Sequence, residues 1–329
     1  MGDVAWLVVS LGIILAGAET FTNGVEWFGQ RLRLGAGAVG SILAAVGTAL
    51  PETMIPVIAF ASGKEEDLTD VGVGAILGAP FMLSTLAFFI SGLAVLVFRR
   101  NAGPMKVDKS VVRRDLGVFI IVYSLAILSS FFPARSLKNL VAAVLIFSYG
   151  YYVHKTVRTS LGRQEHEELP PLYIAHHNHR PGLTLILAQI ILALLAIVSG
   201  AHWFVEAVQS VALATGVPVL VLSLIITPVA TELPEKFNSV LWLRRGKDTL
   251  AIGNITGAMV FQSSVIPALG MSMTAWKLDT MALWSALLAL ISALVPYLTL
   301  QRRGSLSPLS LLVGGGFYLV FLLQVLRIQ

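Results

Sequence analysis

The chain has 329 residues, of which 56% are hydrophobic and only 12% are charged, and its mean hydropathy is +0.81. Soluble domains carry about 25% charged residues, so this composition excludes an ordinary soluble protein and indicates one built into a lipid bilayer. The chain has no cysteine, which excludes disulfides and thiolate metal sites, and its basic isoelectric point of 9.6 is better explained by membrane topology than by nucleic-acid binding.

Apolar stretches of membrane-spanning length follow one another along the chain, at about 20 residues per helix. The first lies close to Asp3 and has no basic segment before it, so we expect a retained helix rather than a cleaved signal peptide. The only long polar interval runs from about Lys155 to Arg180 and separates five predicted helices from five. We therefore predict an all-α polytopic membrane protein with ten spans, at 4–28, 37–62, 71–98, 115–132, 137–156, 182–208, 217–243, 249–274, 279–300 and 306–326.

A six-residue motif occurs twice, each time inside an apolar stretch. The segment from Gly47 to Glu52 (GTALPE) returns as the segment from Ala230 to Glu235 (ATELPE). Shifting the chain by 183 residues aligns 17–52 with 200–235 and makes ten of 36 positions identical. A carboxylate in the middle of a span costs roughly 2.5–3.5 kcal/mol on insertion scales, so a duplicated one indicates a functional site.

The repeat and the distribution of basic residues together predict the topology. If both termini lie outside, 17 of the 23 Lys and Arg residues fall in inner segments and 5 in outer ones, as membrane insertion favours. Five helices per half is an odd number, so the two halves have opposite orientations, with a site at the bilayer midplane between them. We expect a prokaryotic inner membrane protein with residues 1–157 as the first repeat, 158–181 as a cytoplasmic linker and 182–329 as the second repeat.

Glu52 and Glu235 are the central candidates for cation ligands. Two glutamates that face each other in a low-dielectric pocket require a bound proton or cation. Carboxylate oxygen suits hard cations such as calcium, magnesium, manganese or sodium, and carbonyls released by neighbouring prolines add neutral oxygens. Thr48 and Thr231 precede their glutamates by four residues and share a helical face with them. The alternative is a protonated glutamate pair that only bridges helices.

The second motif copy carries additional polar residues. Glu232, Asn238 and Ser239 each lie three or four residues from Glu235, which places them on one side of a helix with it. Lys236 follows Glu232 by four residues, and it either pairs with that carboxylate as a tethered cation or extends toward the membrane surface.

The two motifs, the layout of five plus five helices and the glycine-rich helix after each motif resemble the calcium:cation antiporter superfamily, which includes the sodium/calcium exchangers. The resemblance covers nearly the whole chain and is strongest over 17–90 and 200–270. It implies ten helices in two inverted repeats and counter-transport by alternating access. It also implies that Glu52 and Glu235 are the two ligating glutamates, with Thr48 and Thr231 as the hydroxyl or carbonyl ligands before them.

The chain departs from the family pattern at positions where other members supply oxygen ligands. Ala49 and Glu232 stand where a Ser or Thr follows the motif threonine, and Pro80 and Met259 stand where the next helix carries Asn or Asp. The usual arrangement with several ion sites is therefore not expected. Candidates for replacement ligands are Asn254, Gln262, Ser263 and Ser264.

Three smaller signals lie outside the motifs. Glu19 matches an acidic position of the family near the membrane surface and is a candidate for ion entry. His202 and Glu206, one turn apart, form either an ion-path pair or a satisfied polar pair. The His176–His179 cluster is better explained as a solvated loop than as a metal sensor.

We predict a secondary antiporter, not an enzyme, that exchanges a divalent metal for sodium or protons, with calcium favoured over magnesium or manganese. Its partners are these cations and the bilayer, without a resident cofactor and without nucleic acid. The alternatives are a membrane-embedded metal-dependent enzyme that acts on a lipid phosphate through Glu232 and Glu235, and a transport-inactive cation sensor. The absence of a nucleotide-binding motif argues against a primary pump. The transported ion, the coupling ion and the oligomeric state are left open by the sequence.

Overall fold

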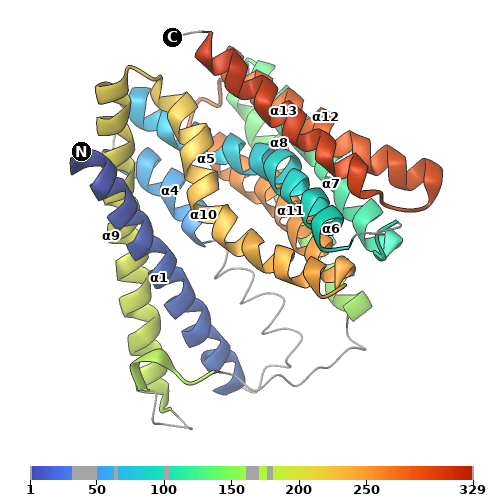
Figure 1. Ribbon diagram of the computed structural model, residues 1–329. Helices are drawn as coiled ribbons and strands as arrows, with labels where there is room; N and C mark the ends of the chain where they lie inside the picture. Colours follow the sequence, from blue (N-terminus) through green and yellow to red (C-terminus); the bar gives the residue numbers. More distant parts are fainter. Residues whose placement is uncertain are drawn as a thin grey trace. The chain divides into compact units, whose positions relative to one another are not determined.

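The computed structural model describes residues 2–31, 50–62, 66–99, 104–160, 170–175 and 181–327. Regular structure in these segments is helical, apart from an isolated bridge between Met105 and Leu306. Figure 1 shows the eleven α-helices of this part of the chain: α1 (Gly2–Arg31), α4 (Leu50–Ser62), α5 (Glu66–Met82), α6 (Phe88–Phe98), α7 (Lys109–Leu128), α8 (Arg135–Ser160), α9 (Leu183–Thr215), α10 (Val219–Arg244), α11 (Asp248–Met273), α12 (Thr280–Arg303) and α13 (Pro308–Leu326).

The described helices coincide with the predicted spans from residue 71 onward. The predicted span 71–98 is one rod formed by α5, a π-helical turn η2 (Leu83–Ala87) and α6. Of the predicted span 37–62, the structure describes α4, and the remainder lies outside the described residues. Seven described helices are long and apolar enough to cross a membrane by length and composition, which confirms an all-helical membrane protein: Val4–Phe28, Leu68–Phe98, Arg135–Thr156, Leu183–Thr215, Asp248–Met273, Thr280–Arg303 and Pro308–Leu326.

The chain divides into two compact units, each assembled from two stretches of sequence. The first unit consists of Met1–Gly63 and Gly150–Val211, and the second of Lys64–Tyr149 and Ala212–Gln329. The first motif copy therefore belongs to the first unit, and the second copy belongs to the second unit. The two units are described one after the other.

In the first unit, α1 and α9 run in antiparallel directions (Figure 1). They pack against each other through two glycines, Gly17 and Gly200. A Cβ added to either glycine would lie 2.9 Å from an isoleucine Cγ1 of the other helix, and 3.2 Å or 3.1 Å from a backbone carbonyl oxygen. The contacts of the two glycines are related by the same offset of 183 residues that relates the motif copies: Ile197 and Ala193 for Gly17, and Ile14 and Ser10 for Gly200. Small residues allow such close approach of membrane helices. In this helix pair the residues related by the sequence repeat therefore make equivalent contacts in both directions, which is called the reciprocal contact below.

The segment 170–175, called the strap below, binds to the same helix pair through two buried amide side chains, Asn23 of α1 and Gln189 of α9. The Asn23 Oδ1 accepts a hydrogen bond from the Tyr173 backbone N–H (3.2 Å), and the Gln189 Oε1 accepts one from the Ile174 N–H (3.0 Å). The Gln189 Nε2 donates to the Asn23 Oδ1 over 2.9 Å, so each amide orients the other. Buried amides in a membrane span need partners, and here the strap supplies them.

In the second unit, α5 approaches α10 closely at Gly74 and Gly78. A Cβ on Gly74 would lie 2.7 Å from the Leu220 carbonyl oxygen, and one on Gly78 would lie 2.3 Å from the Leu224 oxygen and 2.8 Å from the Pro228 ring. Pro228 has no N–H, so it leaves the Leu224 carbonyl one turn earlier without its helical donor. The Leu224 carbonyl oxygen lies at the close contact with Gly78 of α5.

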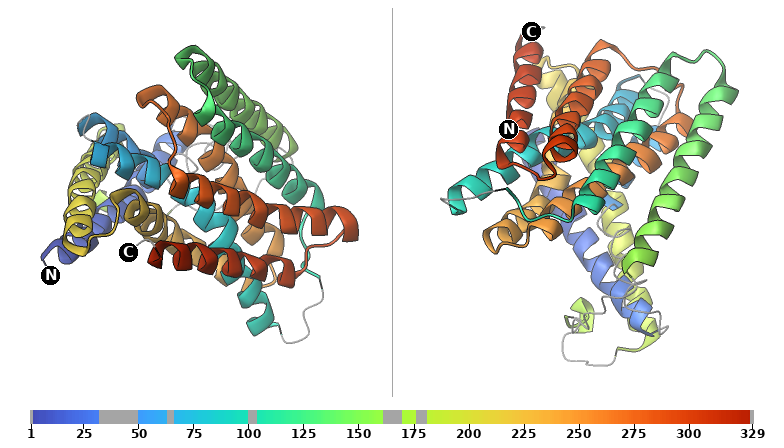
Figure 2. Two further views of the ribbon diagram at one scale, coloured as in Figure 1. Left: turned by 90° about the horizontal axis from the view of Figure 1, so that it is seen from above. Right: turned by 90° about the vertical axis from the view of Figure 1, so that its right-hand side faces the viewer.

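The π-helical turn η2 begins three residues after Pro80 and packs against the last two helices, which lie side by side (Figure 2). The Ser292 hydroxyl of α12 donates to the Ser84 carbonyl oxygen over 2.6 Å. A Cβ on Gly314 of α13 would lie 2.5 Å from the Thr85 carbonyl oxygen. Irregular helical turns leave backbone carbonyls without their usual donors. In this turn the Ser84 carbonyl oxygen is hydrogen-bonded to α12, and the Thr85 carbonyl oxygen, which accepts the Phe88 N–H, lies against α13.

Both ends of α11 are held by basic side chains. Arg99, which follows α6, donates through both terminal nitrogens to the buried Asp248 carboxylate in the first turn of α11, and this hydrogen-bonded pair raises the pKa of Arg99. The Lys106 N–H also donates to Asp248, over 2.8 Å. At the other end, Arg135 and Lys138 donate to backbone carbonyls at and beyond the last turn, where cations suit the helix dipole.

Candidate functional site

The first motif copy places Glu52 in the first turn of α4. Its side chain is buried, with 5% of its surface exposed. A buried carboxylate in a short apolar helix is expensive unless a counter-charge or hydrogen bonds compensate it. Thr48, the predicted helper of Glu52, lies outside the described residues, so its role stays a prediction.

The second motif copy lies on α10, which continues through both of its internal prolines, Pro228 and Pro234. Thr231 and Glu232 are buried, and the Thr231 hydroxyl donates to the Thr227 carbonyl oxygen one turn earlier over 3.0 Å. The side chains of residues 233–238 lie outside the described part of the chain. The predicted roles of Glu235, Lys236 and Asn238 are therefore neither supported nor contradicted here.

Glu232 and Gln262 form a buried polar pair at this motif. The Gln262 Nε2 on α11 donates to the Glu232 Oε1 on α10 over 2.9 Å, and both side chains are only 2% exposed. The other amide atom, Gln262 Oε1, is buried and has no hydrogen-bond partner among the described residues. The structure thus brings together two of the candidate ligands that the sequence left thirty positions apart.

The remaining candidates on α11 have other partners. The Asn254 Nδ2 donates to the Ser239 hydroxyl of α10 over 3.2 Å, which forms a second link between the two helices. Ser263 and Ser264 both donate to the Val260 carbonyl oxygen of their own helix. Their hydroxyl hydrogens are therefore engaged within α11, while each oxygen retains acceptor capacity.

Glu19, predicted near the membrane surface, and Glu206, predicted to pair with His202, both have polar partners. Glu19 on α1 accepts a hydrogen bond from the Tyr173 hydroxyl of the strap over 2.9 Å. This bond and the partial burial of the ring raise the pKa of Tyr173, with burial as the larger cause. On α9 the His202 Nε2 lies 3.3 Å from the Glu206 Oε1, so these two side chains form a polar pair with each other. The His176–His179 cluster lies outside the described residues.

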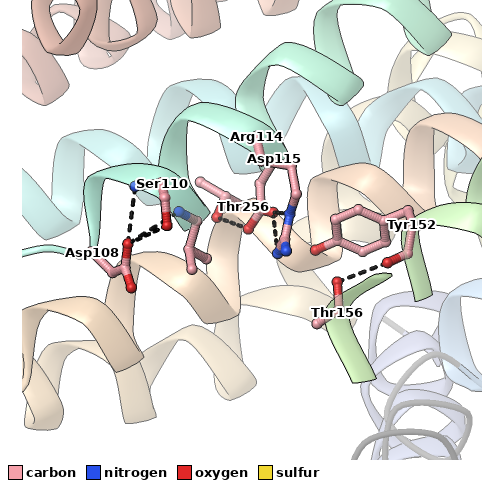
Figure 3. A network of polar contacts seen from close by, with 8 residues as sticks. Asp108, Ser110, Arg114, Asp115, Tyr152, Thr156 and Thr256 are labelled. Carbon is pink, nitrogen blue, oxygen red and sulfur yellow. Dashed lines mark hydrogen bonds and ion pairs between the residues drawn. The ribbon is translucent and has the colours of Figure 1, made fainter. Parts of the chain in front are cut away.

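A buried acid that the sequence analysis did not single out is Asp115 on α7 (Figure 3). Its Oδ1 accepts hydrogen bonds from the Arg114 guanidinium at 2.9 and 3.1 Å, and its Oδ2 accepts one from the Thr256 hydroxyl of α11 at 2.9 Å. The signal in the sequence was the adjacent Arg114-Asp115 pair at the start of a predicted span. This carboxylate is compensated within the unit and ties α7 to α11.

The arrangement around Glu232 offers hard oxygen donors of two kinds, a carboxylate and an amide carbonyl. Among the described side chains no three His, Cys, Asp or Glu groups gather into a metal-binding cluster. Oxygen ligands that combine one or two carboxylates with neutral carbonyls or hydroxyls suit calcium, magnesium or sodium rather than transition metals.

The two copies of the acidic motif lie on α4 and α10, and each copy contains a buried glutamate, Glu52 or Glu232. The chain belongs to the sodium/calcium exchanger protein family, whose model matches residues 3–156 and 185–327. It is therefore a cation exchanger of this family and not an enzyme.

Several known proteins resemble it over most of their length. The putative antiporter CaxA of Alkalimonas amylolytica is 23% identical over 91% of this chain and 90% of its own length. The inner membrane protein YrbG of Escherichia coli (strain K12) is 24% identical over 95% of this chain and 94% of its own. The fold resembles that of the H+/Ca2+ exchanger CAX, with a TM-score of 0.73 at 15% identity over 98% of this chain and 82% of that one.

Proposed function

We propose that this protein is a secondary active antiporter that exchanges a divalent cation for sodium or protons by alternating access. Calcium is the first candidate for the substrate, and magnesium and manganese are the next. The observation that carries the proposal is a buried carboxylate in each copy of the motif, Glu52 and Glu232, in a chain that belongs to an exchanger family. Ionisable side chains inside membrane spans mark ion pathways because burying them is costly.

In this proposal the duplicated glutamates Glu52 and Glu235 are the principal ligands, and Glu232 is a third carboxylate. Thr48, Thr231 and Asn238 supply hydroxyl, carbonyl or amide oxygens. Five further residues are accessory candidates at the site or its entrance: Lys236, Asn254, Gln262, Ser263 and Glu19.

The proposed topology is ten spans in two inverted repeats, with both termini outside and the central linker in the cytoplasm. The reciprocal contact of Gly17 and Gly200 supports the inverted repeats, because helices related by the repeat pack antiparallel with matching partners. The chain has no native cysteine, so a cysteine introduced at Glu167 reports its side of the membrane without background. Labelling of this cysteine by an impermeant reagent from outside would overturn the orientation.

The coupling ion is open between sodium and protons. Met259 is fully buried and supplies no oxygen where the family carries Asn or Asp, so we expect fewer sodium ions than usual, or protons. Because the fold resembles that of a solved H+/Ca2+ exchanger, sodium and proton gradients should both be tested as the driving force. Calcium flux that is steep in sodium and indifferent to pH would contradict this expectation.

The experiment that tests the function is flux into proteoliposomes, with calcium, magnesium, manganese and sodium under imposed sodium and proton gradients. Glu52→Gln and Glu235→Gln each delete one charge with little change of shape. At an effective dielectric constant of about 20, a unit charge attracts a divalent ion at roughly 2.5 Å by about 13 kcal/mol before desolvation. Even after most of this cancels, flux should fall by orders of magnitude.

The matched control is Glu206→Gln, which changes an exposed carboxylate paired with His202 and should retain flux. Near wild-type flux in either motif variant, folded and inserted, would overturn the proposal. Cation binding without flux in the wild-type protein would instead indicate the sensor.

A further inference from the structure

The turn between α10 and α11 (residues 244–247), called the basic turn below, presents three cations. The side chains of Arg244, Arg245 and Lys247 are all exposed. The backbone N–H groups of Arg245, Gly246 and Lys247 donate to carbonyl oxygens in the last turn of α10, and Gly246 takes a positive φ of 75°. The backbone therefore closes this helix end by itself, and the three cations are not needed to cap it.

Two acids next to the start of α11 are engaged elsewhere. Asp248 is buried and binds both Arg99 and the Lys106 N–H. Asp108 caps α7 by accepting hydrogen bonds from N–H groups in the first turn of that helix. Among the described residues, no ion pair includes a cation of the basic turn. Cations that are gathered on a surface without acidic partners attract an anion.

The basic turn lies at the boundary of the membrane-spanning part of the second unit. Two helical segments of spanning length end near it, because one ends at Phe98 and another begins at Asp248. The Arg244 guanidinium carbon lies 5.6 Å from the centre of the Phe98 ring, which is 47% exposed. Trp242 comes just before the turn and is partly exposed, and tryptophan is typical of the membrane interface. The cations therefore lie at the level where lipid headgroups meet acyl chains.

Exposed apolar side chains flank the basic turn in the sequence on both sides. Leu241 precedes it on α10 and Leu250 follows it on α11, and both are exposed. An anionic phospholipid carries a charged phosphate directly above apolar chains, and Lys and Arg at a membrane surface bind such headgroups. A soluble anion would contact the cations alone. The combination of cations and exposed apolar side chains therefore favours a lipid.

We propose that the basic turn binds the phosphate of an anionic phospholipid, with Phe98 and Leu241 against the upper part of its acyl chains. The site contains none of the candidate ligands for the transported cation, so the inference goes beyond the proposed antiport function and does not rest on it. The alternative is that these cations only orient the helices during membrane insertion and bind no lipid.

Trp242 provides a local reporter for the bound lipid. The purified full chain is placed in phosphatidylcholine nanodiscs that contain increasing fractions of phosphatidylglycerol with brominated acyl chains. Bromine quenches tryptophan fluorescence at short range, and the difference between the wild type and Trp242→Phe isolates the signal of Trp242. Brominated phosphatidylcholine is the reference lipid, because it has the same chains and phosphate but no net charge. The wild type should reach half-maximal quenching at a lower fraction of phosphatidylglycerol than of phosphatidylcholine.

Two double variants separate a lipid site from a general effect of positive charge, each made with and without Trp242. Each Lys or Arg near the surface strengthens the attraction of an anionic lipid by about fivefold. Arg245→Gln/Lys247→Gln should therefore lower the preference for phosphatidylglycerol by roughly 25-fold. The matched control is Arg302→Gln/Arg303→Gln, which removes two exposed cations from the last turn of α12 in the same unit and should keep the preference.

The proposal is overturned if the wild type shows no preference between the two lipids at Trp242. It is also overturned if the control variant loses as much preference as the variant of the basic turn, since binding then follows the total charge. Loss of the preference when excess inorganic phosphate is added would assign the turn to a free anion instead of a lipid. Should the double variant fail to insert, Lys247→Gln alone decides, with an expected loss of about fivefold.

Discussion

Replacing Gly78 by alanine is expected to force α5 and α10 apart at the turn that precedes the second motif. The added Cβ would lie 2.3 Å from the Leu224 carbonyl oxygen, where ordinary contact begins at 3.4 Å. Its next neighbours are the Pro228 ring at 2.8 Å and the Leu224 carbonyl carbon at 3.0 Å, none of which can rotate away. The helices must therefore separate by about 1 Å, which forfeits a quarter to a half of the dispersion attraction across the contact.

The expected cost is about 2–3 kcal/mol of overpacking, against a gain of up to about 1 kcal/mol in helix propensity. Gly253→Ala on α11 is the matched control, because no atom of the described residues lies within 4 Å of its added Cβ and the propensity gain is the same. The assay compares thermal unfolding of the two purified variants, together with cation flux. We expect Gly78→Ala to be less stable and slower in transport, since α10 carries Glu232. Equal stability of the two variants would refute the packing argument.

Three other predictions concern the ends of the helices and the strap. Arg99→Leu leaves the buried Asp248 carboxylate without its cation and should cost about 3 kcal/mol in the free energy of unfolding; a loss below about 1 kcal/mol would contradict the buried pair. Asn23→Ala should release the strap, so that a cysteine at the buried position Leu172 reacts rapidly with a maleimide, whereas it should be protected with Asn23 present. The folded protein favours the neutral phenol of Tyr173, because its pKa is raised. Ionisation of Tyr173 should therefore leave strap binding unchanged below pH about 10 and weaken it as the pH rises through the raised pKa. The difference in tyrosinate absorbance between the wild type and Tyr173→Phe should show one tyrosine that ionises at a higher pH than a free tyrosine.

The spans were predictable because hydropathy reports the bilayer directly. Length and apolar content identify a helix such as α9 without knowledge of its neighbours. The functional importance of the motif was predictable for a related reason. Carboxylates such as Glu52 and Glu232 are unfavourable in an apolar stretch, and residues that are unfavourable in their local surroundings are often functional. Their burial is confirmed by the structure.

The partners of polar residues were not predictable from spacing. Gln262 was a candidate by its chemistry, but its bond to Glu232 joins two helices and depends on their rotation about their own axes. The same holds for Asn23 and Gln189, whose amides pair only because α1 and α9 pack antiparallel and the strap returns to them. Local periodicity carries no information on such long-range pairs.

At the crossing of α1 and α9, the same pair of residues from each repeat forms both halves of the contact. Each repeat supplies one glycine and also the isoleucine that receives the glycine of the other repeat, so the contact needs only one sequence used twice in opposite directions. Contacts of this kind are those of a twofold dimer. A half-length chain able to insert in both orientations would already possess this crossing as an interface between two separate molecules. Fusion of the two copies would then have made the contact intramolecular, after which each copy was free to diverge around its own motif.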